Sequence, residues 1–310
     1  MLKNISVIEL ENWIKDVRPY VEKGKVASYI PALQEQDPKN VAMSIHYLDN
    51  HSISAGQTET LFTLQSVSKV IALALALIDK GEDLVFEKVG MEPSADPFYS
   101  IVKLETTHPS KPLNPMINAG ALAVSCLIEG ASPYEKINRL LDFTRQLAGD
   151  QTINYNKKVA DSEFESSFLN RSLAYFMKQS RIVTSDVEEL LSFYTKQCAI
   201  ELNIAQLARI GAVLANNGKD LTSDTQIIPE HYARICKTFM VTCGMYDASG
   251  SFAIKVGIPA KSGVSGAIMG SVKELGGIAV FGPSLDEKGN SVAGFKLMRK
   301  IANQLHLSIF

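Results

Sequence analysis

The chain has 310 residues, and a composition of 46% hydrophobic and 21% charged residues excludes a disordered protein. Its 31 basic and 33 acidic residues nearly cancel, so neither a nucleic-acid-binding stripe nor an acidic tail is expected. The usual prior of roughly 150 residues per domain allows about two folding units.

The N-terminal stretch and the apolar runs argue against export and membrane insertion. Glu9 and Glu11 interrupt the segment where a signal peptide needs unbroken apolar residues. The longest apolar run, residues 70–78, is far shorter than the roughly 20 residues that span a bilayer. No paired metal spacing links the four cysteines, Cys126, Cys198, Cys236 and Cys243. We therefore expect a cytoplasmic protein with reduced thiols.

The first predicted elements are a helix, a hairpin and a buried helix. Residues 11–23 have a helical apolar period that is interrupted near Pro19. Residues 41–49 alternate apolar and polar side chains, and a second short run follows an Asn-His pair, which predicts a hairpin. Ser66 begins an alanine- and leucine-rich segment that ends at Gly81 and is predicted to be a buried helix.

The centre of the chain is predicted to be helical. Residues 132–135 form a capping box with proline at the first helical position, and residues 185–188 repeat the box pattern. Asn203 precedes another apolar-periodic stretch, which stops at residues 216–218. Pro229 begins one more helix.

Short apolar runs alternate with glycines after Cys243. Residues 252–258, 266–272 and 277–281 are predicted strands of an antiparallel meander. Residues 286–290 form a turn, and a closing helix follows over 291–305.

The predicted fold class is α+β, with an antiparallel sheet from both chain ends flanked by helices and a central helical subdomain. Residues 1–310 form a single catalytic unit in this prediction. Its sheet subdomain comprises residues 1–65 plus 245–310, and its helical subdomain comprises residues 66–244. A site is expected in the crevice between the two.

The first candidate motif is Ser66-Val67-Ser68-Lys69, an S-x-x-K. Residues three apart on a helix share a face, so a neutral Lys69 amine could take the Ser66 proton and leave a nucleophile. A second copy, Ser100 to Lys103, lies among prolines and β-formers, where an extended chain would separate the two side chains. The context therefore favours Ser66.

The second candidate motif is Lys261-Ser262-Gly263, a K-[ST]-G expected on a strand edge. Its glycine would let a substrate lie close to the backbone, and the N–H of Val264 could point at an oxyanion. Together the two motifs match the penicillin-recognising signature, although the usual middle motif, S-D-N or Y-x-N, is absent. The five histidines have no ligand spacing, yet a Ser-His-Asp triad assembled in space stays open.

A set of longer segments extends the match along nearly the whole chain. The set comprises SYIPAL at 28–33, LQSVSKV around Ser66, NPMINAGA at 114–121, Glu163 spaced seven residues from Asn170, FYTKQCAIE around Tyr194, GMYDASGSFA around Tyr246, VGIPAKSGVSG ending at Gly266, and PSLDEKGNSVAG. With these segments the chain resembles the serine-dependent glutaminases of bacteria and animals, relatives of the β-lactamases, and the resemblance implies a β-lactamase-like α+β fold. The AIMG after Gly266 departs from the family pattern but includes no candidate site residue.

The resemblance implies a role for each matching residue. Ser66 would be the nucleophile, Lys69 its base and Tyr246 a proton relay near the leaving group. The N–H groups of Ser66 and Val264 would form the oxyanion hole. A carboxylate suits the α-ammonium of glutamine, and amide and hydroxyl donors suit its α-carboxylate. The residues expected to hold that end are Asn118, Glu163, Asn170 and Tyr194, with Tyr29 lining the pocket.

The implied activity is hydrolysis of L-glutamine to L-glutamate and ammonia through a serine acyl-enzyme, with no cofactor and no metal. Two other functions stay open: a different serine amidase or β-lactam hydrolase of the same fold, and a non-catalytic amino-acid sensor. The missing S-D-N argues against the first, and the intact pair of Ser66 and Lys69 argues against the second. The resemblance also implies a homodimer or homotetramer, with no nucleic-acid or membrane partner.

Overall fold

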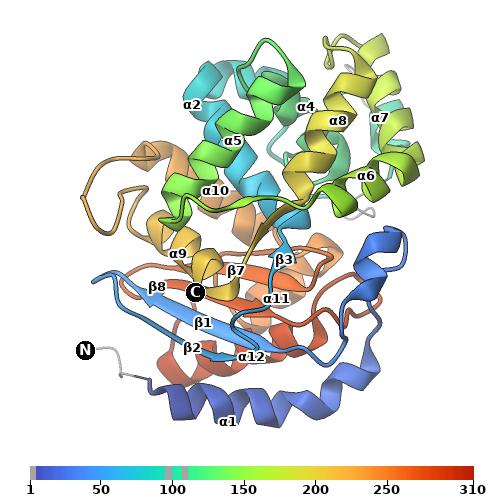
Figure 1. Ribbon diagram of the computed structural model, residues 1–310. Helices are drawn as coiled ribbons and strands as arrows, with labels where there is room; N and C mark the ends of the chain where they lie inside the picture. The colour runs from blue at the N-terminus through green and yellow to red at the C-terminus, as the bar shows by residue number, and fades with distance from the viewer. Residues whose placement is uncertain (1–4, 95–99, 107–110) are drawn as a thin grey trace.

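A central sheet with helices on both faces organises the chain in the computed structural model, which describes residues 5–94, 100–106 and 111–310. A pair of long helices lies below the sheet in Figure 1, and a larger group of helices lies above it. The strands of this sheet come from both ends of the chain, and most of the upper helices come from its centre. The predicted α+β fold class is confirmed.

The main sheet has five antiparallel strands in the order β2-β1-β8-β7-β6. Its strands are β1 (Ala42–Tyr47), β2 (Ser52–Gly56), β6 (Ala260–Ser262), β7 (Ala267–Val272) and β8 (Gly276–Phe281). β1 and β2 form the predicted hairpin, and β8 joins the two chain ends by placing Phe281 opposite Ala42. β6 lies at the edge of the sheet, so Lys261 and Ser262 are on an edge strand as expected.

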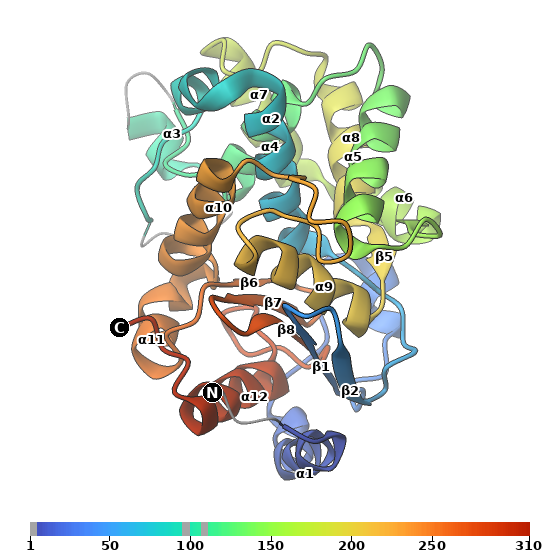
Figure 2. The same cartoon turned by 90° about the vertical axis from the view of Figure 1, so that its left-hand side faces the viewer.

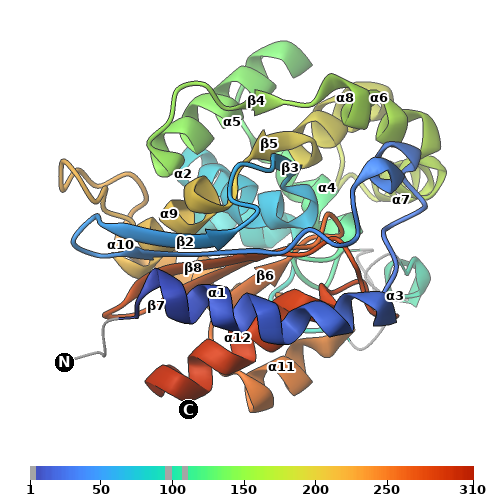
Figure 3. The ribbon, with the colours of Figure 1, turned by 60° about the horizontal axis from the view of Figure 1, so that its bottom comes forward.

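Helices cover both faces of this sheet. α1 (Val7–Val17) and α12 (Val292–Leu305) pack together beneath one face, with α11 (Ser249–Lys255) beside α12 (Figures 2 and 3). α9 (Ile204–Ala215) lies on the other face and contacts β1, β7 and β8. It lies this close because Gly277 faces it: a Cβ there would be 1.8 Å from the carbonyl oxygen of Ala208.

The remaining helices pack around α2 and above α9. They are α2 (Ser68–Lys88), α3 (Val102–Thr106), α4 (Asn118–Leu127), α5 (Pro133–Ala148), α6 (Lys157–Ser166), α7 (Phe168–Gln179), α8 (Val187–Cys198) and α10 (Glu230–Cys243). α2 is buried along residues 70–77, where alanine and leucine alternate, and it contacts α4, α5 and α10. Within the described ranges, no helix combines the length and the apolar character needed to cross a membrane.

Three short strands from separate parts of the chain form a small second sheet. It has the order β3-β5-β4, with β3 at Phe62–Thr63, β4 at Asn154–Tyr155 and β5 at Ile200–Leu202. Just after β3, the Leu64 N–H donates to the Ile200 carbonyl at 2.8 Å. This sheet therefore anchors the segment that leads into Ser66.

The structure corrects several predicted boundaries. The predicted strand over 252–258 is wrong, because residues 249–255 form α11. The long helix begins at Ser68 rather than Ser66, and it is kinked at Gly81 (φ 75°) rather than ended there. The capping residue of α8 is Asp186, whose side chain accepts from the Glu188 and Glu189 N–H groups, and not Ser185.

The segment around the second S-x-x-K is also not extended throughout. Ser100 accepts a hydrogen bond from the Val102 N–H at the start of α3. Residues 96–99, the Lys103 side chain and His108 lie outside the described part of the chain.

Candidate active site

Ser66 lies on a 3₁₀ turn at Gln65–Val67, between β3 and the first turn of α2. The turn begins in an unusual conformation, since Gln65 has φ 46° although it is not glycine. Ser66 itself is 8% exposed. The Ser66 hydroxyl is therefore nearly buried at the N-terminus of α2, where the helix dipole favours negative charge that develops on the oxygen.

Lys69 lies one turn further on and is buried. Its Nζ donates to the Met116 carbonyl oxygen at 3.1 Å and to Asn118 Oδ1 at 2.8 Å. Burial lowers the pKa of Lys69 to about 8, although the nearby Cys198 and Glu163 oppose the shift. A neutral amine has two N–H groups and one lone pair, so these two acceptors leave the lone pair available for a proton.

Tyr246 meets this turn from the other side of the site. It occupies a 3₁₀ turn at Tyr246–Ala248, at φ 55°, and it is buried. Burial raises the pKa of Tyr246, and a side-chain hydrogen bond with Ser66 partly offsets that rise. Ser249 holds the strained turn, because its hydroxyl donates to the Tyr246 carbonyl and accepts from the Met245 N–H.

The end of β6 packs against Tyr246 and against the segment that leads into Ser66. Lys261 is fully buried, its Nζ lies 4.5 Å from the Tyr246 ring centroid, and it donates to the Ser262 carbonyl at 2.7 Å. Burial lowers the pKa of Lys261 well below its ordinary value, and the charge of Lys69 adds to the shift. A Cβ at Gly263 would be 2.6 Å from the Leu64 carbonyl oxygen. Only glycine therefore lets the end of β6 come this close to the segment that precedes Ser66.

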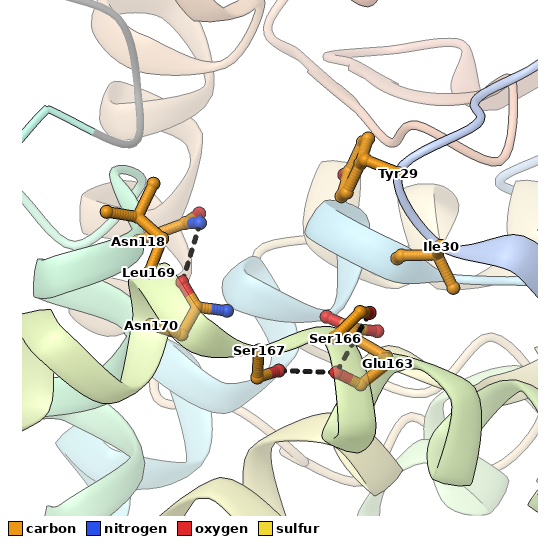
Figure 4. Close-up of a pocket in the computed structure, with 8 residues that line it drawn as sticks. All are labelled: Tyr29, Ile30, Asn118, Glu163, Ser166, Ser167, Leu169 and Asn170. Carbon is orange, nitrogen blue, oxygen red and sulfur yellow. Dashed lines mark hydrogen bonds between the residues drawn. The ribbon is translucent and has the colours of Figure 1, made fainter.

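A cavity of about 380 Å³ adjoins these groups. Figure 4 shows Tyr29 and Ile30, from the N-terminal segment, across the cavity from Asn118 and Asn170. The other lining residues come from α6, α7 and the junction between them: Glu163, Ser166, Ser167 and Leu169. The volume suits a small molecule, and the lining mixes apolar surface with a few polar groups.

Glu163 is the one acidic residue in that lining, and it is 7% exposed. Gln65 Nε2 donates to its Oε2 at 3.4 Å. Burial raises the pKa of Glu163 to about 7, while the hydrogen bond from Gln65 and the Lys69 charge lower it. A buried carboxyl group with a raised pKa is well suited to form an ion pair with a cationic group that enters the cavity.

Asn118 and Asn170 are joined by a hydrogen bond from Asn118 Nδ2 to Asn170 Oδ1 at 3.0 Å. Asn118 is the first residue of α4 and also accepts from Lys69, so it connects the amine to the cavity. Tyr194, on α8, is buried outside the residues that line the cavity, and burial raises the pKa of its hydroxyl. Its side chain hydrogen-bonds Cys198, whose thiol also reaches Glu163.

The structure thus brings Tyr29, Asn118, Glu163 and Asn170 into one cavity. Lys69 is linked to this cavity by its hydrogen bond to Asn118, and Ser66 is hydrogen-bonded to Tyr246. Val264 and Tyr246 belong to the same apolar cluster as Ile30, and Val264 lines a further cavity of about 520 Å³ together with Tyr29. Tyr194 is buried and is not among the residues that line either cavity.

Two groups that complete the site were not singled out from the sequence. Gln65 contacts Glu163, and the Met116 carbonyl accepts from Lys69. The position of Gln65 beside the candidate nucleophile was the available signal. Its positive φ could not be foreseen, because glutamine is not a residue that favours that region.

The chain is similar to known glutaminases over nearly its whole length. The family model described as Glutaminase matches residues 24–310. A glutaminase of Bacillus cytotoxicus is 56% identical over 306 residues, which covers 99% of both chains. A glutaminase of Shouchella clausii is 58% identical over 302 residues, covering 97% of this chain and 98% of the relative.

Solved structures extend the likeness to the fold. A probable glutaminase from Bacillus subtilis complexed with 6-diazo-5-oxo-L-norleucine superposes with a TM-score of 0.91 at 38% identity. The match covers 100% of this chain and 99% of that one. In another structure, a Bacillus subtilis glutaminase forms a covalent complex with 5-oxo-L-norleucine after reaction with 6-diazo-5-oxo-L-norleucine. It superposes with a TM-score of 0.90 at 38% identity, and the match covers 98% of this chain and 99% of that one. The chain belongs to the glutaminase family.

Proposed function

We propose that the chain hydrolyses the side-chain amide of L-glutamine to L-glutamate and ammonia through an acyl-enzyme on Ser66. The observation that carries this proposal is the buried Lys69 amine, with a pKa of about 8, one turn from the nearly buried Ser66 hydroxyl. Beside them lies a cavity lined by one buried carboxylate and two amides. The family and its relatives support glutamine as the substrate.

In the acylation step, the neutral Lys69 amine accepts the Ser66 proton as the Ser66 oxygen attacks the side-chain carbonyl carbon of glutamine. The N–H groups of Ser66 and Val264 stabilise the oxyanion. Tyr246, hydrogen-bonded to Ser66, donates its hydroxyl proton to the leaving nitrogen as the carbon–nitrogen bond breaks and ammonia departs, and the Lys69 ammonium then returns a proton to the Tyr246 oxygen, which leaves both groups neutral again. A water molecule then attacks the ester, Lys69 accepts its proton and returns one to Ser66, and glutamate is released.

The amino-acid end of glutamine is oriented by charge and hydrogen bonding. The Glu163 carboxylate pairs with the α-ammonium, which would draw the pKa of Glu163 down from about 7 on binding. The α-carboxylate accepts hydrogen bonds from the Asn118 and Asn170 amides and the Tyr194 hydroxyl. Tyr29, which is 57% exposed, lies over the cavity on the solvent side.

Ammonia release from L-glutamine by the purified protein tests this function. We expect turnover of L-glutamine, no turnover with Ser66→Ala, and covalent modification of Ser66 by 6-diazo-5-oxo-L-norleucine. Tight glutamine binding without turnover would show a sensor instead. Labelling of Ser66 by a penicillin, with no ammonia released from glutamine, would show a β-lactam-reactive enzyme.

We further propose a cytoplasmic homodimer or homotetramer. All four cysteines lie in the described ranges and are free, which fits a reducing compartment. Sedimentation at micromolar concentration tests the assembly, and a monomer there would refute it.

A further inference from the structure

A chain of buried side-chain hydrogen bonds lies beneath the turn that carries Ser66. Ser125 Oγ donates to Gln197 Oε1 at 3.0 Å, and Gln197 Nε2 donates to Ser68 Oγ at 3.3 Å. Ser68 Oγ donates in turn to the Gln65 carbonyl oxygen at 2.7 Å. Each of these four residues is at most 2% exposed, so water cannot replace any one of the bonds.

This chain joins the three helices that supply most of the candidate site. Ser125 is on α4, which begins with Asn118, and Gln197 is on α8, which carries Tyr194. Ser68 begins α2, which carries Lys69. α4 contacts both α2 and α8, and α8 also contacts the turn at Gln65–Val67, so the amide of Gln197 bridges elements that are packed together (Figure 1).

The chain ends on the strained residue of the site. Gln65 at φ 46° occupies a conformation that a non-glycine residue keeps only when its surroundings hold it. Its carbonyl is fixed by Ser68, and its side chain donates to Glu163 and to Thr63 Oγ1, each at 3.4 Å. The orientation of Gln65 therefore sets where Ser66, the next residue, presents its hydroxyl.

We propose that Gln197 is a positioning residue for glutamine hydrolysis, because its buried amide holds Ser68 and thereby the strained Gln65 turn that aims Ser66. The inference rests on the proposed function. Gln197 has two roles in the chain, since its amide oxygen accepts from α4 while its amide nitrogen donates to α2. It belongs to neither the residues that line the cavity nor the acceptors of Lys69, so any effect on the reaction must be transmitted through other residues.

The test replaces Gln197 with methionine, which keeps the length of the side chain and removes both hydrogen bonds. We expect kcat to fall about 10- to 100-fold, as displacement of a reacting group by about 1 Å can do. KM for L-glutamine should change less than about threefold, since the cavity side chains are retained. The rate of inactivation by 6-diazo-5-oxo-L-norleucine, which reports attack by Ser66, should fall in parallel with kcat.

A matched control separates positioning from stability. Thr144→Val on α5 removes another fully buried hydrogen bond, from Thr144 Oγ1 to the Leu140 carbonyl at 2.7 Å, and should leave kcat unchanged. The pH midpoint of kcat/KM should also be the same in Gln197→Met as in wild type, because Lys69 keeps both acceptors.

Two further variants keep the inference falsifiable. Ser125→Ala, which leaves Gln197 in place, should lower kcat in the same direction by a smaller factor. Ser68→Ala combined with Gln197→Met should lose no more than the worse single variant, because both act through one chain. Wild-type kcat in folded Gln197→Met, or a rise in KM alone, would overturn the inference while leaving the proposed function intact. No ammonia release by the wild type would overturn both.

Discussion

The first turn of α2 and the end of β6 each bury a lysine beside the candidate nucleophile, and they do so differently. Lys69 donates to two oxygens, the Met116 carbonyl and the Asn118 amide, and two acidic groups, Glu163 and Cys198, lie near enough to oppose its deprotonation. Lys261 donates to one oxygen, the carbonyl of the next residue, and lies over the Tyr246 ring near a second cation.

The difference separates a lysine with a pKa of about 8 from one whose pKa lies well below its ordinary value. Burial alone pushes the pKa of both amines down, but compensation stops the fall for Lys69 at about 8. Such a group can accept a proton in one step and return it in the next. Lys261 has one hydrogen-bond acceptor, and the charge of Lys69 lowers its pKa further. We therefore assign Lys261 to the packing of Tyr246 and the β6 end rather than to proton transfer.

The largest effect expected from this comparison follows Lys69→Ala. We expect a loss of about 10³-fold or more in kcat/KM, nearly as complete as that of Ser66→Ala, because a nucleophile and its base act as a unit. Ammonia release measures this, and the double variant should be no worse than either single one. Lys136→Ala is a matched control, since Lys136 is half-buried and donates to the Cys126 carbonyl at 3.1 Å, away from the cavity. If Lys69→Ala kept most of its activity, the base would have to be another group, with Tyr246 the next candidate.

Tyr246→Phe should have the next largest effect. The ring that underlies Lys261 stays, and only the hydroxyl that meets Ser66 is lost. We expect kcat to fall about 10²-fold, the usual contribution of a proton-transfer group, with KM nearly unchanged. Tyr194→Phe is the contrasting variant, because a hydroxyl that binds the substrate should raise KM more than it lowers kcat. Equal kcat effects in both would remove the distinction between relay and binding residue.

The sequence predicted the main sheet, its composition from both chain ends and most of the long helices. It failed at α11, where a short apolar run between glycines was predicted to be a strand. In the fold, Phe252 is buried while Ile254 is 88% exposed, so the apolar run does not form one buried face. Such a short element is decided by tertiary packing, here of Phe252 against Phe295 of α12, and not by its own pattern.

The residue types of the candidate site were predictable, but their environments were not. The motifs at Ser66 and Lys261 name the groups, whereas the pKa of Lys69 depends on its burial and on Cys198 and Glu163, which are distant in the sequence. The chain through Gln197 likewise joins residues of three helices that no local pattern connects. Burial and partner identity are properties of the assembled fold, and they separate the two lysines.

The pH dependence of kcat/KM tests the pKa of Lys69, and the expected change is smaller than the losses caused by these substitutions. Lys69 must be neutral to act, so activity should rise with pH through an ionisation near 8. Glu163 must be ionised to pair with the α-ammonium, and its pKa of about 7 adds a second rising ionisation. The slope should approach about tenfold per unit between pH 7 and 8, and should be steeper below 7. Glu163→Gln should lose the lower ionisation and keep the upper one, and a profile that falls over this range would contradict the assignment of Lys69.

The smallest expected effect is on stability, and it differs between the two lysines. An unfolded chain carries each lysine charged and solvated up to its ordinary pKa of 10.5, whereas burial lowers the folded pKa of both. The free energy of unfolding therefore rises with pH between the folded and unfolded pKa values of each group.

Replacement by methionine removes the free-energy cost of burying an amine that is charged in the unfolded chain, and we expect Lys261→Met to raise Tm by about 2–6 °C near pH 7. Lys69→Met should gain less, because it leaves two acceptors unpaired instead of one. The gain for Lys69→Met should stay constant below pH 8 and shrink only above it, whereas the gain for Lys261→Met should begin to shrink at a lower pH, because the pKa of Lys261 is lowered further. Thermal unfolding of both variants as a function of pH measures the difference, and identical pH dependence would mean that the two buried amines titrate alike.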